Sequence, residues 1–304
     1  MENAPKSLFK YLPRERLGVL QDLLIRFSQA SSLNDTLELR PPIKGVAAHE
    51  TLAGIGIGKL APTVWSDASA MNPKVLDNKK TLDSLCPGLA DLAAEILLQT
   101  TAQKFADAVR LRHEKNPHAM FDLVDRNFGI LSLTQTATDV RMWGHYADGG
   151  RGFLIEFDPE HPWFHAKQEE RDSFRHMQKV NYVSTRPAMY LLDLTELEFL
   201  YTKWDVWKDE QEWRIIRCFN EAAKRCDGLD PYGNEILLFA IPPGSIKAVV
   251  IGFSASSDFE TEICSTLSKN SALAHVVVSR ATQSKDTSQV DIHSGTMDVK
   301  GCTE

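Results

Sequence analysis

Short apolar segments separated by polar turns recur along the chain, and their lengths indicate strands more often than helices. An apolar and aromatic run at residues 7–12, ended by Pro13, predicts a first strand, and leucines at helical spacing predict a helix within residues 14–24. Further compact apolar runs predict strands at about residues 25–28, 129–134, 151–157, 179–183, 212–218, 235–241, 246–253 and 274–279. Short strands mixed with irregular helices favour an α+β fold over a regular βαβ series.

Longer periodic segments predict helices. The longest amphipathic pattern spans residues 89–113, a second apolar segment at residues 191–207 is also expected to be helical, and residues 257–267 carry an apolar stripe. Residues 1–280 are predicted to form one domain, in which about residues 41–125 form a largely helical insertion. From residue 281 to residue 304 the chain is polar, which predicts a loose C-terminal tail.

Composition places the chain among ordinary globular proteins. It has 304 residues, of which 43% are hydrophobic and 25% charged. The net charge of −7 gives no overall electrostatic footprint for nucleic acid, although a local basic groove would not show in a sum. The five cysteines form no CxxC pair, and no segment reads as a signal peptide or a membrane span. We therefore expect a cytoplasmic protein with no membrane partner.

The stretch from Trp207 to Ile216 carries the most suggestive chemistry. Glu210 and Glu212 are two positions apart, which on an extended backbone places both carboxylates on one face of a strand. Such a pair suits an enzyme that holds sugar hydroxyls and stabilises a developing positive charge. The alternative is that these acidic residues end a helix and are solvated where the strand begins.

Other candidate residues lie on the neighbouring predicted elements. Ser132 and Thr134 share one face of a strand, where they either contact a ligand or pair across strands. Trp143 and Tyr146 are neighbours on a helical turn. Tyr146 needs a hydroxyl partner in any setting, and Trp143 has the area of a core residue. The paired glycines 149–150 permit a sharp reversal.

Further residues fit less specific roles. Asn34 and Asp35 either form a simple turn or touch a ligand. Arg214 is expected to pair with a nearby carboxylate. The spacing of the histidines at positions 161, 165 and 176 does not match a metal site, so we expect no metal.

The order of these segments resembles the bacterial family named domain of unknown function 2971. The resemblance runs from Leu8 to about Phe253, and its specific parts are the Met-Trp-Gly-His-Tyr-Ala block at 142–147 and the Trp-x2-Glu-x-Glu-Trp-Arg block at 207–214. The weaker parts are a Lys-Tyr strand, an Arg-Phe-Ser-Gln segment, a Ser-Leu-Thr strand and a lysine four positions before Trp207, which extends the second block to Lys-x3-Trp-x2-Glu-x-Glu-Trp-Arg. Two features differ from the family: Thr36 stands where the family has proline, and Gly150 or its neighbour stands where it has histidine.

That family is similar in pattern to the ADP-ribosyltransferase superfamily, which implies a split β-sandwich that binds NAD in a cleft. Carried over by position, the resemblance implies Glu212 and Glu210 as catalytic residues. It implies cofactor contacts from the early strand, the middle strand and the aromatic block, namely Lys10, Tyr11, Arg26, Ser132, Thr134, Trp143 and Tyr146. Glu212 would stabilise the oxocarbenium character at the ribose, and Glu210 would orient or deprotonate the acceptor.

The resemblance therefore implies an NAD-dependent ADP-ribosyltransferase that acts as a toxin or phage-defence effector. Its expected acceptor is a nucleic-acid base in RNA or DNA. The alternatives are a protein-modifying transferase, an NAD-glycohydrolase, or a non-enzymatic binding module that kept the fold. The insertion at about residues 41–125 is the part expected to contact a partner, such as an antitoxin protein.

Overall fold

The structure is a computed structural model that describes residues 5–34, 43–45, 79–80, 83–84, 87–88, 90–91, 119–167, 174–185, 189–190 and 198–297. The chain divides into two compact units, the first formed by Met1–Leu39, Phe121–Thr185 and Phe199–Glu304, the second by Arg40–Met120 and Arg186–Glu198. In the second unit, β3 (Ile43–Gly45) pairs in parallel with β8 (Met189–Tyr190). The helix predicted at residues 89–113 lies largely outside the described residues.

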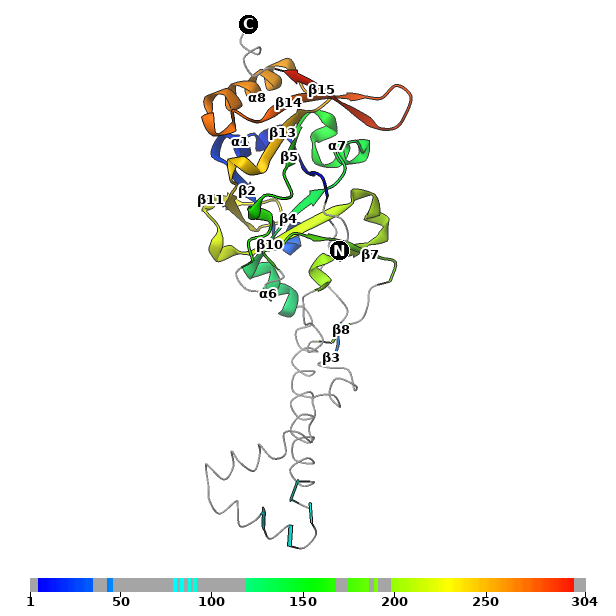
Figure 1. Cartoon of the computed structure of the whole chain (residues 1–304), viewed down its shortest axis with the longest axis vertical. Coiled ribbons are helices and arrows are strands. Elements are labelled where there is room, and N and C mark those ends of the chain that lie inside the picture. The colour runs from blue at the N-terminus through cyan, green and yellow to red at the C-terminus, as the bar shows by residue number, and fades with distance from the viewer. Residues whose placement is uncertain are drawn as a thin grey trace. The chain divides into compact units, whose positions relative to one another are not determined.

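The first unit is an α+β structure built on a large mixed sheet (Figure 1). Its described strands run in the order β15-β14-β13-β5-β1-β4-β10-β6. Their bounds are β1 Leu8–Leu12, β4 Phe128–Thr134, β5 Phe153–Phe157, β6 Gln178–Lys179, β10 Glu212–Cys218, β13 Ile246–Ile251, β14 Val277–Gln283 and β15 Val290–Met297. The pairing is antiparallel except between β13 and β14, which are parallel and are joined through the helix α8 (Ser257–Lys269).

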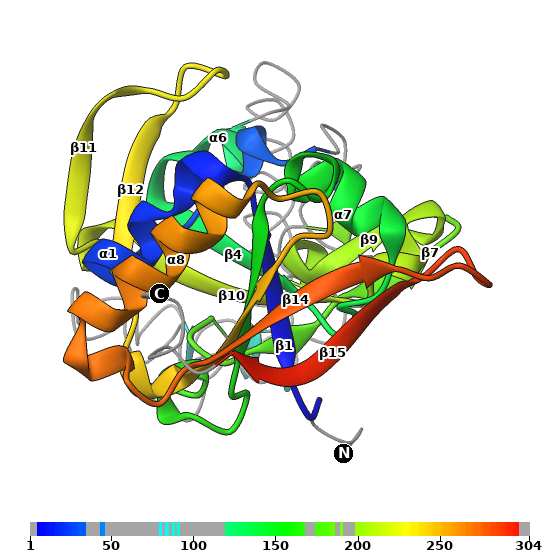
Figure 2. The same ribbon diagram turned by 90° about the horizontal axis from the view of Figure 1, so that it is seen from above.

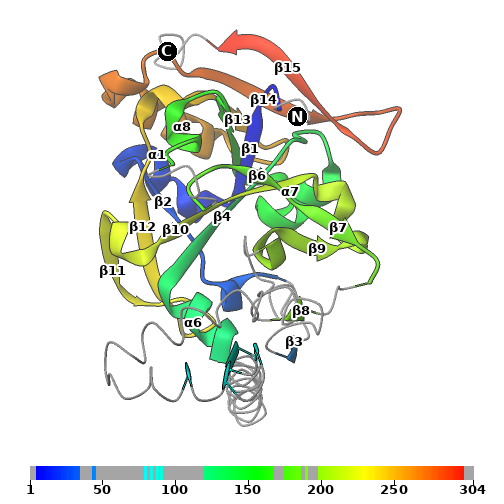
Figure 3. The same cartoon turned by 60° about the horizontal axis from the view of Figure 1, so that its bottom comes forward.

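Two smaller groups of strands complete the first unit (Figure 3). The strands β2 (Leu24–Arg26), β12 (Glu235–Ala240) and β11 (Lys224–Leu229) form a three-stranded antiparallel sheet. The short strands β7 (Asn181–Val183) and β9 (Thr202–Trp204) pair in parallel.

The strands β1 and β4 pair at one position and then diverge. Phe9 opposite Thr134 is the single register pair between these two strands, whereas β4 pairs with β10 from Thr134 to Phe128. Nearer the start of β4, Ile130 bridges to Ser28 rather than to β1. The sheet therefore opens between β1 and β4, which are neighbours in the strand order, and polar side chains on both strands lie beside the opening.

The large sheet buries an apolar cluster on each face. One cluster takes Leu8 and Leu12 from β1 together with residues of α1 (Gly18–Asp22) and α8, which lie side by side (Figure 2). The other takes Tyr11 together with residues of α7 (Val140–Tyr146). The assignment of Leu8 and Tyr11 to opposite faces follows from the strand period of two.

The helix α8 matches the sequence prediction closely. Its stripe of Phe259, Ile263 and Leu267 is buried, and the side chain of Ser256 caps its first turn by accepting from the backbone N–H of Phe259. The remaining described helices are α6 (Ala119–Asn127) and a set of short 3₁₀ helices. None of the helices in the described ranges combines the length and the apolar character that a bilayer crossing requires.

Two predictions about secondary structure are wrong. The loose tail predicted from residue 281 includes the end of β14 and the whole of β15, which pair antiparallel, and Val290 is fully buried. The helix predicted at residues 191–207 is replaced in its described part by the 3₁₀ helices η6 (Glu198–Tyr201) and η7 (Asp205–Glu210), with the strand β9 between them. In both segments the pairing with another strand decides the structure, β14 for β15 and β7 for β9, and the local pattern does not show that pairing.

The reversal between α7 and β5 depends on the paired glycines. Gly149 and Gly150 both have positive φ angles, of 64° and 80°, which only glycine adopts without strain. A Cβ atom at Gly150 would also lie 2.5 Å from the ring of Phe253, whereas a Cβ atom at Gly149 would have Arg151 Nη1 as its nearest neighbour, 3.7 Å away.

We predict that Gly150→Ala lowers the free energy of unfolding by about 2–5 kcal/mol, because roughly 1–2 kcal/mol of backbone strain adds to roughly 1–3 kcal/mol of overpacking. Gly149→Ala carries the strain alone and should cost about 1–2 kcal/mol. Urea unfolding of the two variants measures the difference. Equal losses would show that the contact with Phe253 is not tight.

Candidate active site

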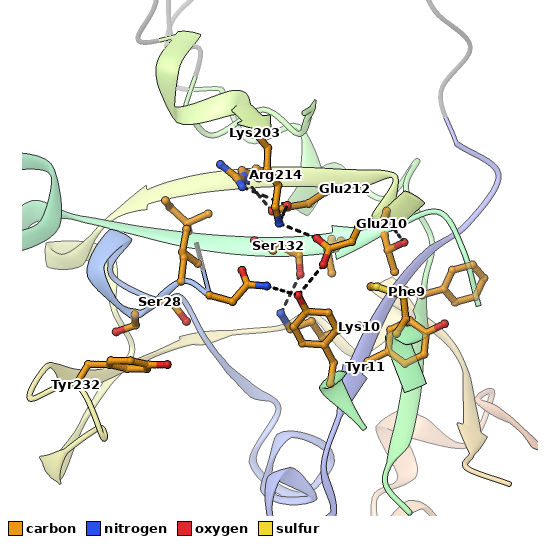
Figure 4. Close-up of a pocket in the computed structure, with 18 residues that line it drawn as sticks. Phe9, Lys10, Tyr11, Ser28, Ser132, Lys203, Glu210, Glu212, Arg214 and Tyr232 are labelled. Atoms are coloured by element: carbon orange, nitrogen blue, oxygen red, sulfur yellow. Dashed lines mark hydrogen bonds and ion pairs between the residues drawn. The ribbon is translucent and has the colours of Figure 1, made fainter. Parts of the chain in front are cut away.

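A cavity of about 240 Å³ lies beside the opening between β1 and β4 (Figure 4). Its lining comes from β1, β4, α7, β9, the end of η7 and the start of β10, together with the segment of residues 28–34 after β2 and Tyr232 from the turn between β11 and β12. The charged side chains in this lining are Lys10, Lys203, Glu210, Glu212 and Arg214. With three cations and two carboxylates, the lining has a small positive excess, which suits a ligand that carries anionic groups.

Lys203 joins the two glutamates. Its Nζ lies 2.7 Å from Glu210 Oε2 and 2.9 Å from Glu212 Oε2, and its side chain is only 3% exposed. Burial lowers the pKa of Lys203, but the neighbouring carboxylates of Glu212 and Glu210 outweigh that effect and raise it above its ordinary value. Lys203 is therefore a fixed cation that holds the two carboxylates on one side of the cavity.

Arg214 neutralises the second carboxylate. Its Nε lies 2.7 Å from Glu212 Oε1, its Nη2 lies 3.2 Å from Glu212 Oε2, and the whole residue is buried. Arg214 also donates through Nη1 to the carbonyl of Leu200. The expectation that Arg214 pairs with a nearby carboxylate is confirmed.

The glutamates converge because the backbone turns between them. Glu210 ends η7, Gln211 has a positive φ of 46°, and Glu212 begins β10. Thr134 holds this turn, since its hydroxyl donates to the carbonyl of Glu210 at 2.5 Å. The prediction that the two carboxylates share a side is confirmed, but the predicted reason, an extended backbone through both residues, is wrong.

Tyr146 connects the first carboxylate to the neighbouring loop. Its hydroxyl donates to Glu210 Oε1 at 2.7 Å and accepts from Asn34 Nδ2 at 2.6 Å. Burial and the negative charge of Glu210 raise the pKa of Tyr146. The hydroxyl therefore stays protonated near neutral pH and acts as a hydrogen-bond donor.

Among the cations that line the cavity, Lys10 is the one that forms no direct ion pair with a carboxylate of the described residues. Its Nζ donates to the carbonyl of Ser132 at 2.9 Å, across the opening between β1 and β4. Burial, assisted by the nearby charge of Arg16, lowers the pKa of Lys10 from 10.5 to about 8. Lys10 is thus charged at neutral pH but close to its titration range.

Five of the seven predicted cofactor contacts line this cavity, namely Lys10, Tyr11, Ser132, Thr134 and Tyr146. Tyr11 is almost entirely buried and donates to the carbonyl of Thr136, so its contribution is mainly to the wall. Among the residues the structure describes, no three metal-ligating side chains come together, and the expectation of a metal-free site stays a prediction.

The other two predicted contacts lie elsewhere. Trp143 is fully buried in the core, where its indole N–H donates to the carbonyl of Ala137 and its ring packs edge-on against Tyr11. Arg26 does not line the cavity; it pairs with Asp230 at 2.5 Å and borders a second cavity. Both assignments are corrected: Trp143 fills the core, as its large apolar area favours, and Arg26 holds a turn.

Sequence reasoning gave no role to Lys203, the residue that organises the site. The signal was present, since Lys203 is the first residue of the Lys-x3-Trp-x2-Glu-x-Glu-Trp-Arg pattern. It was obscured because residues 191–207 read as an amphipathic helix. The cavity also includes Ser28, the serine of the Arg-Phe-Ser-Gln segment, and Tyr232, which no motif indicated.

The fold and site define an α+β protein with a charged cavity at the opening of its main sheet. A family model described as "Protein of unknown function (DUF2971)" matches residues 142–215. The match includes most of α7, both glutamates and the first half of β10. It supports the family resemblance that the sequence suggested. No curated protein and no solved structure matches the chain.

We predict that Lys203→Met destabilises the protein by about 3–5 kcal/mol, because it leaves two carboxylates buried without their shared cation. Lys208→Met is the matched control: Lys208 is exposed on η7, which directly follows the strand β9 that carries Lys203, and its loss should change stability by less than about 0.5 kcal/mol. Chemical denaturation of both variants provides the measurement. A Lys203→Met protein as stable as the control would mean that the buried ion pairs contribute nothing.

Proposed function

We propose that the protein is an NAD-dependent ADP-ribosyltransferase that transfers ADP-ribose to a nucleic-acid base, in the role of a toxin or phage-defence effector. One observation carries the proposal: Glu210, Glu212 and Tyr146 converge in a cavity at the opening of the main sheet. The opening between β1 and β4 is consistent with a split β-sandwich of the ADP-ribosyltransferase type, and that fold assignment is part of the proposal.

The cavity would hold only part of the dinucleotide. Ligand pockets for whole drug-sized molecules are typically about 300–1,000 Å³, and this cavity is about 240 Å³. The nicotinamide and its ribose fit the proposal best, since the carboxylates and the Tyr146 ring lie there. Lys10 would meet the pyrophosphate or the carboxamide as a hydrogen-bonding cation.

In the proposed reaction the bond between nicotinamide and the ribose anomeric carbon breaks, and nicotinamide leaves as a neutral molecule with the bonding electrons. The ribose then carries oxocarbenium character, as in glycoside hydrolysis. A carboxylate that accepts a hydrogen bond from a ribose hydroxyl stabilises this charge more in the transition state than in the ground state. A nitrogen or oxygen of the acceptor forms the new bond to the anomeric carbon and gives up its proton to a base.

The contact geometry bears on which glutamate does which task. A carboxylate accepts about four hydrogen bonds. Glu212 already accepts one from Lys203 and two from Arg214, while Glu210 accepts one from Lys203 and one from Tyr146. Glu210 therefore has more capacity for a ribose hydroxyl, and we propose it as the carboxylate that touches the ligand, with Glu212 anchoring it electrostatically. In the reverse assignment Glu212 binds the ribose and Glu210 orients or deprotonates the acceptor.

One observation favours an alternative function. Lys203 and Arg214 balance the charges of both glutamates within the buried network. A balanced network of this kind also suits a binding module without catalysis. An NAD-glycohydrolase, in which water replaces the acceptor, and a protein-modifying transferase use the same site.

We predict that Glu210→Gln reduces NAD turnover by about 10²–10³, because a positioned electrostatic stabiliser is lost. The measurement is NAD consumption by the purified protein, together with mass spectrometry of RNA, DNA and protein for added ADP-ribose. Glu212→Gln should also lose activity, and should lose stability as well because Arg214 is left buried without a full carboxylate partner.

The products separate the alternatives. Free ADP-ribose without a modified macromolecule indicates a glycohydrolase, and modified protein without modified nucleic acid indicates a protein transferase. A wild-type chain that consumes no NAD with any acceptor, or a Glu210→Gln variant with full turnover, would overturn the proposed catalysis.

We further predict that affinity for ADP-ribose falls as the pH rises through about 8. Lys10 carries its charge below its pKa of about 8 and loses it above that value, so attraction to the pyrophosphate weakens in the same range. Because the pKa of the folded state lies below the ordinary 10.5, the stability of the unliganded protein should rise with pH between these two values. Calorimetric titration on both sides of pH 8 tests the binding. Lys10→Arg should keep its affinity across the range, and a wild-type affinity that does not change would contradict the role of Lys10.

A further inference from the structure

The turn between β11 and β12 places an exposed aromatic ring at the cavity. Tyr232 lines the cavity, and 64% of its surface is exposed. In Figure 4 its ring lies at the edge of the group of lining residues, apart from Glu210 and Glu212. Within the described part of the chain, no other ring stacks on Tyr232 and its hydroxyl has no hydrogen-bond partner.

A buried carboxylate fixes the backbone that carries this ring. Asp230 Oδ1 accepts from the backbone N–H groups of Tyr232 at 2.9 Å and Asn234 at 2.8 Å. Asp230 Oδ2 accepts from Arg26 at 2.5 Å and from the hydroxyl of Ser32 at 2.7 Å. Burial alone would raise the pKa of Asp230, but the bonds from Arg26 and Ser32 lower it to about 2, so the anchor is charged at neutral pH.

A second set of bonds ties the same turn to the loop after β2. Asn234 Nδ2 donates to the hydroxyls of Ser31 and Ser32, and Gln29 Nε2 donates to the carbonyl of Glu235. The turn is therefore held from both of its ends. An exposed ring on a fixed backbone can bind a flat partner at little cost in conformational entropy, because only its side-chain torsions remain to be ordered.

Cavity size indicates where a ligand would meet this ring. A cavity of about 240 Å³ takes only part of a dinucleotide, so the rest of a bound molecule must extend beyond it. The exposed ring of Tyr232 is a suitable surface for a planar heterocycle, since aromatic rings stack on any nucleobase.

We propose that Tyr232 is a stacking platform for a nucleobase that extends from the cavity. The choice of a nucleobase rests on the function proposed above, and two sources can supply it: the adenine of NAD or a base of the acceptor strand. Tyr232 is on this view a binding residue rather than a catalytic one, and its hydroxyl is not required.

Binding measurements without turnover test the proposal. Tyr232→Ala should weaken binding of AMP and ADP-ribose, or of a short single-stranded oligonucleotide, by roughly 5- to 150-fold, which corresponds to the loss of one base–aromatic stack. Tyr232→Phe should bind as the wild type does. Nicotinamide mononucleotide, which lacks the adenine, should bind equally to all three proteins. Leu229→Ala is the matched control, because Leu229 is exposed on the same hairpin and does not line the cavity.

The outcomes identify the source of the base. Weaker binding of AMP and ADP-ribose assigns the ring to adenine, and weaker binding of the oligonucleotide alone assigns it to the acceptor. If Tyr232→Ala binds every probe as tightly as the wild type does, the platform does not exist. This result would leave the proposed catalysis intact, because the Glu210→Gln experiment tests that separately; conversely, base stacking can hold even where no NAD is consumed.

Discussion

The site depends on a buried ammonium group that lies between two carboxylates. Lys203 contacts both Glu210 and Glu212 from a position with almost no exposure. Two carboxylates this close would repel each other strongly in a poorly hydrated environment. The cation offsets that repulsion, and Arg214 supplies a second positive charge for Glu212. The bond from Tyr146 to Glu210 joins the same network.

The surrounding fold explains why these groups meet. The main sheet opens between β1 and β4, so the backbone carbonyl of Ser132 accepts from Lys10 rather than from a strand neighbour. The tight turn at Gln211 brings Glu210 back toward Glu212, and Thr134 secures it from the adjacent strand. The polar side chains of the site thus occupy the place where regular strand pairing stops, and unused hydrogen-bonding groups there are available to a ligand.

Sequence patterns predicted much of this arrangement where the cause is local. The stripe of α8 and the reversal at Gly149 and Gly150 follow from helical spacing and from glycine conformation, and both are present. The two glutamates were located correctly as a pair. Lys203 was missed because its strand is three residues long and lies within an apolar segment that reads as a helix. The strand β15 was missed because its alternating polar residues gain their order from pairing with β14. Tyr232 had no periodic signal, since its position depends on contacts with residues about 200 positions earlier in the chain.

The location of β1 has a consequence for synthesis of the chain. It precedes the other described strands of the main sheet in the chain, yet it lies in the interior of that sheet, and Lys10 bonds to a residue 122 positions later. At about 5–20 residues per second, a ribosome needs on the order of ten seconds to deliver that partner. Throughout this interval both edges of an apolar strand are unpaired in the nascent chain, a condition that favours association with other chains. A molecular chaperone bound to β1 as it emerges from the ribosome would protect the protein during that delay.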